Sequence, residues 1–189
     1  MSLEYNELIL LDALAYYREF SDFLSMKLGE KQFQIDYVRV YDKGAFTPTE
    51  VTSLPLEAYI EGADASLVNK DGKTEITVRN AGALEYGVMG IIKGNKIQTG
   101  ETYTLSFDVS SDTEREMIVT AEDSVYTRFL DEKLKITPEK TYYSFDVTFT
   151  DNMAGNLADL KFQLGNISNA SLLSEHTVIL SNISWQKKQ

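Results

Sequence analysis

Cysteine is absent from the 189-residue sequence, and histidine occurs once, as His176. The absence of cysteine excludes disulfides, thiolate metal sites and cysteine nucleophiles. With a single histidine, a multi-histidine metal site is excluded, and a Ser-His-Asp triad has only one candidate base. His176 lies at the apparent start of a strand, and we expect it to be an ordinary surface side chain rather than a functional one.

Basic residues are also scarce, because 18 Lys and Arg stand against 29 Asp and Glu, which gives a net charge of -11. A chain this acidic repels phosphate backbones and anionic lipid surfaces, so nucleic acid and membranes are not expected partners. No stretch reaches the roughly 18 apolar residues that a membrane span needs. Neutral ligands such as sugars are compatible with this charge.

Catalytic motifs are missing as well. The sequence has no Gly-x-Ser-x-Gly, no phosphate-binding loop and no metal-binding histidine pair. Its acidic pairs, such as Glu122-Asp123, are adjacent in sequence, and neighbours on a strand face opposite sides. A glycosidase needs two carboxylates that converge at about 5 Å or somewhat more. We therefore predict a non-catalytic chain without catalytic or metal-binding residues.

The sequence does contain a regular alternation of apolar and polar residues between Thr74 and Trp185. The alternating runs lie at residues 74–79, 103–110, 117–122, 143–150 and 160–164. Because successive strand side chains point to opposite faces, each run has one buried and one wet face. Glycines and polar clusters separate the runs. This pattern predicts an all-β fold, an antiparallel β-sandwich of the jelly-roll type.

The last strand-like run is less regular than the others. Val178 and Leu180 share one face of the expected strand, whereas Ile179, Ile183 and Trp185 share the other. Apolar residues on both faces indicate either a strand that is buried on both sides or a strand with a bulge.

Three segments are expected along the chain. Residues 1–45 form an N-terminal segment, either the tail of an upstream catalytic domain or a contributor to the sandwich. Within it, residues 7–28 have the spacing of a short amphipathic helix, with strand or irregular structure as the alternative. Residues 46–56 contain two of the three prolines and are interpreted as a linker or loop. Residues 57–189 form the predicted sandwich.

Six phrases of the sequence resemble, in order, those of a known family. They lie at residues 69–73, 97–110, 121–126, 142–145, 162–165 and 177–184, and the strongest is Ile97 to Ser110. Together they cover residues 63–185, which resemble the carbohydrate-binding modules of families four and nine, the cellulose- and xylan-binding type. The resemblance implies a β-sandwich that binds a polysaccharide without cutting it.

The candidate ligand-binding residues come partly from this resemblance and partly from the alternation. Arg79, Glu122 and Gln163 lie opposite the apolar positions of their strands, so we expect them on a common wet face. In the resembling modules, a glutamine at the place of Gln163 contacts the glycan. The resemblance also places aromatic contacts at Tyr86 and Tyr126. For each tyrosine alone, an ordinary half-buried side chain is an equal alternative.

Two family features are absent. The phrase of the first strand, which ends in Asn-Gly-Asp-Phe, does not occur. We therefore expect the N-terminal third to supply an edge of the sandwich by another sequence, and the alternative is that the sandwich lacks this strand. The closing strand of the family often carries an aspartate that helps to hold a structural calcium, and this position is Ser181 here. Because calcium usually needs carboxylate ligands, no cofactor is expected to be required, and a structural calcium is the alternative.

A second, shorter resemblance concerns residues 35–41, which are similar to the closing strand of glycoside hydrolase family sixteen. The catalytic motif of that family, Glu-x-Asp followed by another Glu, does not occur. The sequence thus predicts a monomeric, extracellular module of a bacterial glycanase, linked to an upstream catalytic domain. Its expected ligand is a β-glucan, xylan or related polysaccharide. The alternative is a structural or adhesive sandwich of a surface protein, without a sugar site.

Overall fold

The computed structural model describes residues 53–188, which lie within one compact unit, Val51–Gln189. The helix expected at residues 7–28 and the hydrolase-like strand at 35–41 lie outside the described residues. So does most of the segment interpreted as a linker, residues 46–56. The first described strand begins at Glu57.

The described residues form ten strands and one short helix. The strands are β1 (Glu57–Ile60), β2 (Asp64–Lys70), β3 (Lys73–Asn80), β4 (Val88–Lys96), β5 (Thr102–Ser111), β6 (Arg115–Glu122), β7 (Arg128–Ile136), β8 (Thr141–Thr148), β9 (Leu157–Gln163) and β10 (His176–Lys187), and the 3-10 helix is η1 (Ile167–Leu172). Among residues 53–188, no helix has the length and apolarity that a membrane crossing requires.

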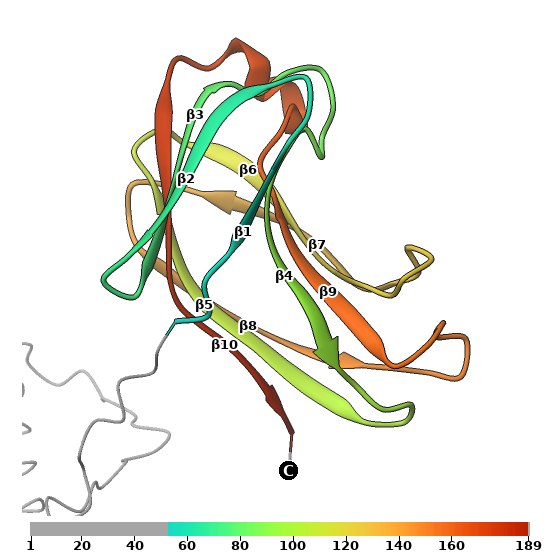
Figure 1. Cartoon of the computed structure of the whole chain (residues 1–189). Coiled ribbons are helices and arrows are strands. Elements are labelled where there is room, and N and C mark those ends of the chain that lie inside the picture. Colours follow the sequence, from blue (N-terminus) through green and yellow to red (C-terminus); the bar gives the residue numbers. More distant parts are fainter. Residues whose placement is uncertain (1–52, 189) are drawn as a thin grey trace, which may run out of the picture. The chain divides into compact units, whose positions relative to one another are not determined.

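The strands make two five-stranded antiparallel sheets that face each other (Figure 1). Sheet A has the order β1-β4-β9-β6-β7, and sheet B has the order β2-β3-β10-β5-β8. The predicted all-β, antiparallel sandwich is therefore confirmed. The outermost strands on one side are β1 and β2, which come from residues 57–70. A contribution of residues 1–45 to an edge of the sandwich lies outside the described residues and stays a prediction.

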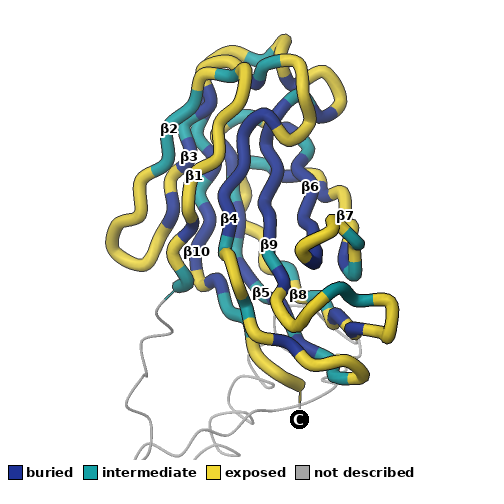
Figure 2. Tube along the Cα trace, turned by 45° about the vertical axis from the view of Figure 1, so that its right-hand side comes forward, coloured by how far each residue is buried: buried dark blue, intermediate teal, exposed yellow. Residues whose placement is uncertain are grey.

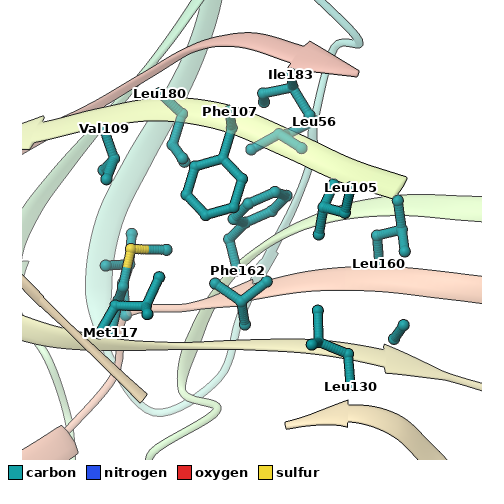
Figure 3. Close-up of a cluster of buried hydrophobic side chains, with 14 of the residues drawn as sticks. Leu56, Leu105, Phe107, Val109, Met117, Leu130, Leu160, Phe162, Leu180 and Ile183 are labelled. Atoms are coloured by element: carbon teal, nitrogen blue, oxygen red, sulfur yellow. The ribbon is translucent and has the colours of Figure 1, made fainter. Parts of the chain in front are cut away.

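The alternation in the sequence decides which side chains fill the space between the sheets. In β5, Leu105 and Phe107 are fully buried, while Thr104 and Ser106, which alternate with them, remain partly exposed. Phe107 of sheet B meets Phe162 of sheet A edge to face, with ring centroids 5.1 Å apart (Figure 3). This is a favourable geometry for two aromatic rings, and it joins the two sheets at the middle of the core.

A bulge resolves the irregular last strand. The pairing of β10 with β5 shifts between Ser181 and Ser184, and Asn182 inside the shift has a φ of 53°. The extra residue turns Ile183 inward, where it is fully buried with Val178. Of the two interpretations of this strand, the bulge is correct.

His176 is buried, which corrects the expectation of a surface histidine. It has the same parity on β10 as Val178, so it points into the sandwich and is only 2% exposed. Arg115 Nη1 lies 2.6 Å from His176 Nε2, and the carbonyl oxygen of Ser174 lies 2.7 Å from Nδ1. Because a guanidinium only donates, Nε2 accepts and Nδ1–H donates to Ser174.

Arg115 itself is a buried cation held by neutral acceptors. Its Nη2 donates to the carbonyl oxygens of Leu164 at 2.6 Å and Gly165 at 3.1 Å. Burial lowers the pKa of Arg115 to about 10. Arg115 therefore connects His176 at the start of β10 to the turn between β9 and η1.

Candidate functional site

The register of sheet A lines up side chains in rows on its outer face. One row runs from Tyr59 on β1 through Met89 on β4 to Gln163 on β9. The next row runs through Lys161 on β9 to Thr120 on β6. Paired residues on neighbouring strands have Cβ atoms about 5 Å apart, so each row forms a continuous strip across the sheet.

Met89 and Gln163 of the first row and Lys161 of the second lie at the floor of a groove of about 500 Å³. Its lining residues come from β1, β4, β6, β7, β9 and two connections between strands: Tyr59, Tyr86, Met89, Ile91, Glu122, Tyr126, Arg128, Asp159, Lys161 and Gln163. The central strands β9 and β6 and the first half of β4 are largely buried, whereas β1 at the edge is exposed along its length (Figure 2).

Tyr59 and Tyr86 form the first wall of the groove, and both side chains are partly exposed. The hydroxyl of Tyr59 donates to the carboxylate of Glu61, and this hydrogen bond is the main reason that the pKa of Tyr59 is raised. Tyr86 lies in the β3–β4 connection, at the upper right of Figure 1. A tyrosine ring offers an apolar face and a polar tip.

The β3–β4 connection is fixed by backbone hydrogen bonds on two sides. Glu61 N donates to Gly87 O at 2.8 Å, and Gly165 N donates to Glu85 O at 3.0 Å. The approach at Gly165 is so close that an added Cβ would lie 2.1 Å from Leu84 O. Glycine is therefore required at this position, and Tyr86 is carried by a rigid loop.

The floor contains a chain of alternating charges. The ammonium of Lys161 donates to the carboxylate of Glu122, and both side chains are almost fully buried. Arg128 Nε lies 3.2 Å from the other Glu122 oxygen, and Arg128 also pairs with Asp131 at 3.0 Å. The hydrogen bond to Asp131 is the main cause that raises the pKa of Arg128. Lys161 and Arg128, the two cations of this chain of charges, thus each have a carboxylate partner.

Tyr126 forms the second wall. It lies in the β6–β7 connection, at the right of Figure 1. Its ring is the cation–π partner of Lys161, whose Nζ lies 4.8 Å from the ring centroid. The side chain is nevertheless 74% exposed, so most of the ring is open to a ligand.

The structure brings four of the five sequence-predicted residues together. Tyr86, Glu122, Tyr126 and Gln163 all line the groove. Arg79 does not, because it lies on β3 in sheet B and pairs with Asp64 at 3.3 Å. The expectation of a common wet face is therefore wrong for Arg79. Alternation tells which side of its own strand a residue takes, but not which sheet the strand joins.

Four polar or aromatic lining residues are not among those predicted from the sequence: Tyr59, Arg128, Asp159 and Lys161. Lys161 has the same parity as Gln163 on β9, so the alternation already placed it on the same face. Tyr59 lies on a four-residue strand that is too short to show a period. Arg128 reaches the groove beside a register shift between Ala121 and Glu122, which no sequence pattern announces.

The carboxylates near the groove are engaged in structural contacts. Glu122 is shared by Lys161 and Arg128, and Asp159 Oδ1 accepts a hydrogen bond from Gly94 N at 2.9 Å. Within residues 53–188, no group of three or more His, Asp or Glu side chains is placed to hold a metal ion. The expectation that no cofactor is required, with a structural calcium as the alternative, stays a prediction. The groove presents aromatic faces, an amide and paired charges, which suit reversible binding of a polyhydroxylated ligand.

Comparison with known proteins is consistent with this geometry. A family model described as "Carbohydrate binding domain" matches residues 51–171. A solved structure described as "CBM4 structure and function" is similar with a TM-score of 0.58 and 21% identity, over 68% of this chain and 80% of that chain. The N-terminal cellulose-binding domain of β-1,4-glucanase C from Cellulomonas fimi is similar with a TM-score of 0.55 and 23% identity, over 74% and 94%.

The second N-terminal cellulose-binding domain of the same glucanase has a TM-score of 0.53 and 19% identity, over 71% of this chain and 86% of that chain. At these identities the solved structures show a shared fold. No curated protein sequence matches the chain. The family resemblance deduced from the six phrases is confirmed by the family model.

Proposed function

The chain belongs to the carbohydrate-binding domain family, whose members bind glycans without cutting them, and we propose that the groove on sheet A is where it holds a polysaccharide. The observation that carries this proposal is the pair of tyrosine walls, with Tyr86 on one side and Tyr126 on the other, above a polar floor. Such an arrangement matches the chemistry of a sugar ring on both its face and its edge.

A pyranose ring has an apolar face of C–H groups and a rim of hydroxyls. The apolar faces of Tyr86 and Tyr126 suit stacking against the ring. The amide of Gln163 both donates and accepts hydrogen bonds, as a hydroxyl does. Gln163 lies at the floor of the groove and is largely buried, so its amide is placed to meet the hydroxyls of a ligand that enters there.

The direction of the groove favours a long ligand. Its lining runs from β1 to β7, which are the two edge strands of sheet A. Five strands about 4.8 Å apart span about 19 Å, the length of about four linked pyranose rings. Among residues 53–188, no strand pairs with the outer side of β1 or of β7. A polysaccharide is therefore free to enter at one edge and leave at the other, so an internal segment is held rather than a chain end.

The charges of the groove favour a neutral polysaccharide. Lys161 and Arg128 are both paired with carboxylates, so neither is free to bind a uronate or a sulfate. A net charge of -11 also repels acidic glycans. The similar domains of the Cellulomonas fimi glucanase are cellulose-binding, which supports a β-glucan as ligand. Xylan has a similar neutral backbone and is the next candidate.

The setting of the module follows from this ligand. Polysaccharides such as β-glucan and xylan are met outside the cell, so we propose an extracellular, monomeric module of a bacterial glycanase. Attached to a catalytic domain, it would raise the local concentration of that domain on its substrate, as linked binding sites generally do.

Calorimetry with the complete chain and laminarin, lichenan, xylan and soluble cellulose tests the proposal. We expect saturable binding to at least one of the four, with no release of reducing ends. If none binds, the groove is not a polysaccharide site of this class, and the alternative of a structural or adhesive sandwich gains support. Release of reducing ends would contradict the non-catalytic assignment.

A further inference from the structure

Tyr126 has an unusual backbone conformation for a tyrosine. Its φ is 66°, in the left-handed region, which residues with a bulky side chain rarely adopt. Such a conformation is costly and persists only where the surrounding structure holds it. The short β6–β7 connection must therefore contain groups that fix Tyr126.

Asp123 supplies these groups. Its Oδ1 accepts hydrogen bonds from the backbone N–H groups of Val125 and Thr127, both at 2.9 Å, which are the two neighbours of Tyr126 in sequence. The backbone of Asp123 adds two more contacts, since its N–H donates to Thr127 O and its carbonyl accepts from Tyr126 N, both at 3.1 Å. Every residue from 125 to 127 is thus bound to Asp123.

The same carboxylate also joins two connections. Its Oδ2 accepts a hydrogen bond from Ala154 N at 2.8 Å, and Ala154 lies in the connection between β8 and β9. The Asp123 side chain is almost fully buried by these contacts. Burial by itself raises the pKa of the carboxyl, but the backbone donors from Ala154, Thr127 and Val125 outweigh it and hold the pKa below its ordinary value.

These contacts place the Tyr126 ring against the groove. The ring is the cation–π partner of Lys161, and Lys161 is fixed in turn by Glu122. The hydrogen bonds to Asp123 therefore fix the backbone conformation around Tyr126, while the ammonium of Lys161 contacts the Tyr126 ring. The side chain of Asp123 does not line the groove, so it has no part in contacting a ligand there.

We infer that Asp123 is a positioning residue of the glycan site, which holds Tyr126 in its left-handed conformation so that the ring stands as the second wall. This inference rests on the proposed function for its effect on affinity, but not for the geometry it describes. A pre-ordered aromatic wall loses less conformational entropy on binding than a mobile one. A simple stabilising turn would give no such effect on affinity.

The test compares Asp123→Asn with the wild-type chain by NMR and calorimetry. An asparagine keeps the shape of the side chain, but its amide nitrogen cannot accept from Ala154, and its one oxygen is a weaker acceptor than a carboxylate. We expect faster amide exchange at Val125, Thr127 and Ala154. We also expect loss of the nuclear Overhauser contacts between the Tyr126 ring and the Lys161 side chain.

Affinity is measured with the same four polysaccharides. Asp123→Asn is expected to weaken binding about fivefold, the cost of ordering one mobile aromatic side chain. The double variant Asp123→Asn with Tyr126→Ala should bind no more weakly than Tyr126→Ala alone, because both changes remove the same wall.

Asp112→Asn is the matched control. Asp112 also binds a backbone N–H through its carboxylate, that of Thr177 at 3.0 Å, but it does not line the groove. Asp112→Asn should at most lower the free energy of unfolding: the contacts of the Tyr126 ring and the affinity for the polysaccharide should both stay unchanged. A loss of affinity in Asp112→Asn equal to that in Asp123→Asn would overturn the inference.

The outcomes separate this inference from the proposed function. If Asp123→Asn keeps the contacts between the Tyr126 ring and Lys161, Asp123 does not position Tyr126, whatever binds. If the wild-type chain binds none of the four polysaccharides, the proposed function fails, while the NMR contacts still decide the role of Asp123. If the contacts are lost but affinity is unchanged, Asp123 holds a loop and not a binding wall.

Discussion

Lys161 Nζ lies 4.8 Å from the centroid of the Tyr126 ring, so one buried cation connects the floor of the groove to its second wall. The same ammonium is paired with the buried carboxylate of Glu122. Removing one partner of a buried ion pair leaves the other uncompensated, which is usually more costly than replacing both.

We therefore expect Lys161→Met to lower the free energy of unfolding by about 2 kcal/mol. Part of the full penalty is avoided because Arg128 still contacts Glu122. The double variant Lys161→Met with Glu122→Gln should recover part of the loss, since no buried charge is left unpaired. Urea unfolding at neutral pH measures both. A double variant less stable than Lys161→Met would show that the ion pair is not the source of the effect.

The two tyrosine walls give a second prediction. Tyr86→Ala and Tyr126→Ala should each weaken polysaccharide binding by about fivefold to tenfold, the worth of one aromatic contact. Because both side chains are exposed, the free energy of unfolding should change by less than about 0.5 kcal/mol. Calorimetry and urea unfolding check the two halves of this statement.

Tyr142→Ala is the control for both variants. Tyr142 is 63% exposed on β8 of sheet B, away from the groove lining. Arg79→Ala serves the same purpose for a charged residue, because Arg79 also lies in sheet B. Neither change should alter affinity. If either control bound more weakly while Tyr86→Ala bound normally, the binding site would lie on sheet B and not on sheet A.

Much of the sandwich was predictable because the face that a residue takes on a strand depends on its position in the local sequence. A period of two gives the inner and outer face of each strand, and the burial of β5 follows that period at each of its ten residues. His176 shows that the same rule was available for a polar residue, since its parity matches Val178. The surface position predicted for His176 rests on its residue type and not on this parity, which is why that prediction is wrong.

The composition of the groove was less predictable because it depends on pairing between distant strands. Gln163 and Glu122 share the groove only because β9 lies beside β6, and Arg79 is excluded only because β3 joins sheet B. The alternation of apolar and polar residues predicts neither of these strand positions. Tyr59 is added by a short edge strand that pairs with β4. The alternation therefore predicts which residues share one face of a strand, and the order of the strands in each sheet decides which strands contribute to the groove.

Thr120 gives a prediction about stability. Its hydroxyl is fully buried, and it has no hydrogen-bond partner among the described residues. A buried polar group without a partner costs about 1–3 kcal/mol. Thr120→Val keeps the shape and removes the hydroxyl, so we expect unfolding to cost about 1 kcal/mol more than in the wild type. A less stable Thr120→Val variant would show that the hydroxyl is satisfied in solution.

Asp123 gives a prediction about how the stability of the fold depends on pH. Its carboxyl has a pKa below the ordinary value of 3.8 in the folded chain, so the unfolded chain binds protons more readily at low pH. Stability rises with pH wherever the unfolded state binds more protons. The contribution of Asp123 is therefore fully present above the ordinary value and is lost as the pH falls through the lower, folded-state value.

In consequence, the thermal stability of the wild type should fall more steeply below pH 4 than that of Asp123→Asn. Thermal melts from pH 7 to pH 2.5, followed by circular dichroism, compare the two slopes. The variant should be less stable at neutral pH and approach the wild type in acid. Parallel curves over the whole range would mean that the carboxyl of Asp123 has an ordinary pKa.

Gly165 gives the last prediction, because it links the buried core to the first wall. An added Cβ would lie 2.1 Å from Leu84 O and 2.5 Å from Glu85 O, in the loop that carries Tyr86. Gly165→Ala should therefore push this loop outward, lower the free energy of unfolding by about 2 kcal/mol and weaken polysaccharide binding.

Gly94→Ala separates this effect from glycine loss in general. Gly94 has a φ of 67°, but nothing lies within 4 Å of an added Cβ. Its substitution strains the backbone by about 1–2 kcal/mol without displacing a neighbour. If both variants lose stability but only Gly165→Ala loses affinity, the clash at Leu84 is transmitted to Tyr86. Equal affinity in the two variants would show that the first wall does not depend on the contact at Gly165.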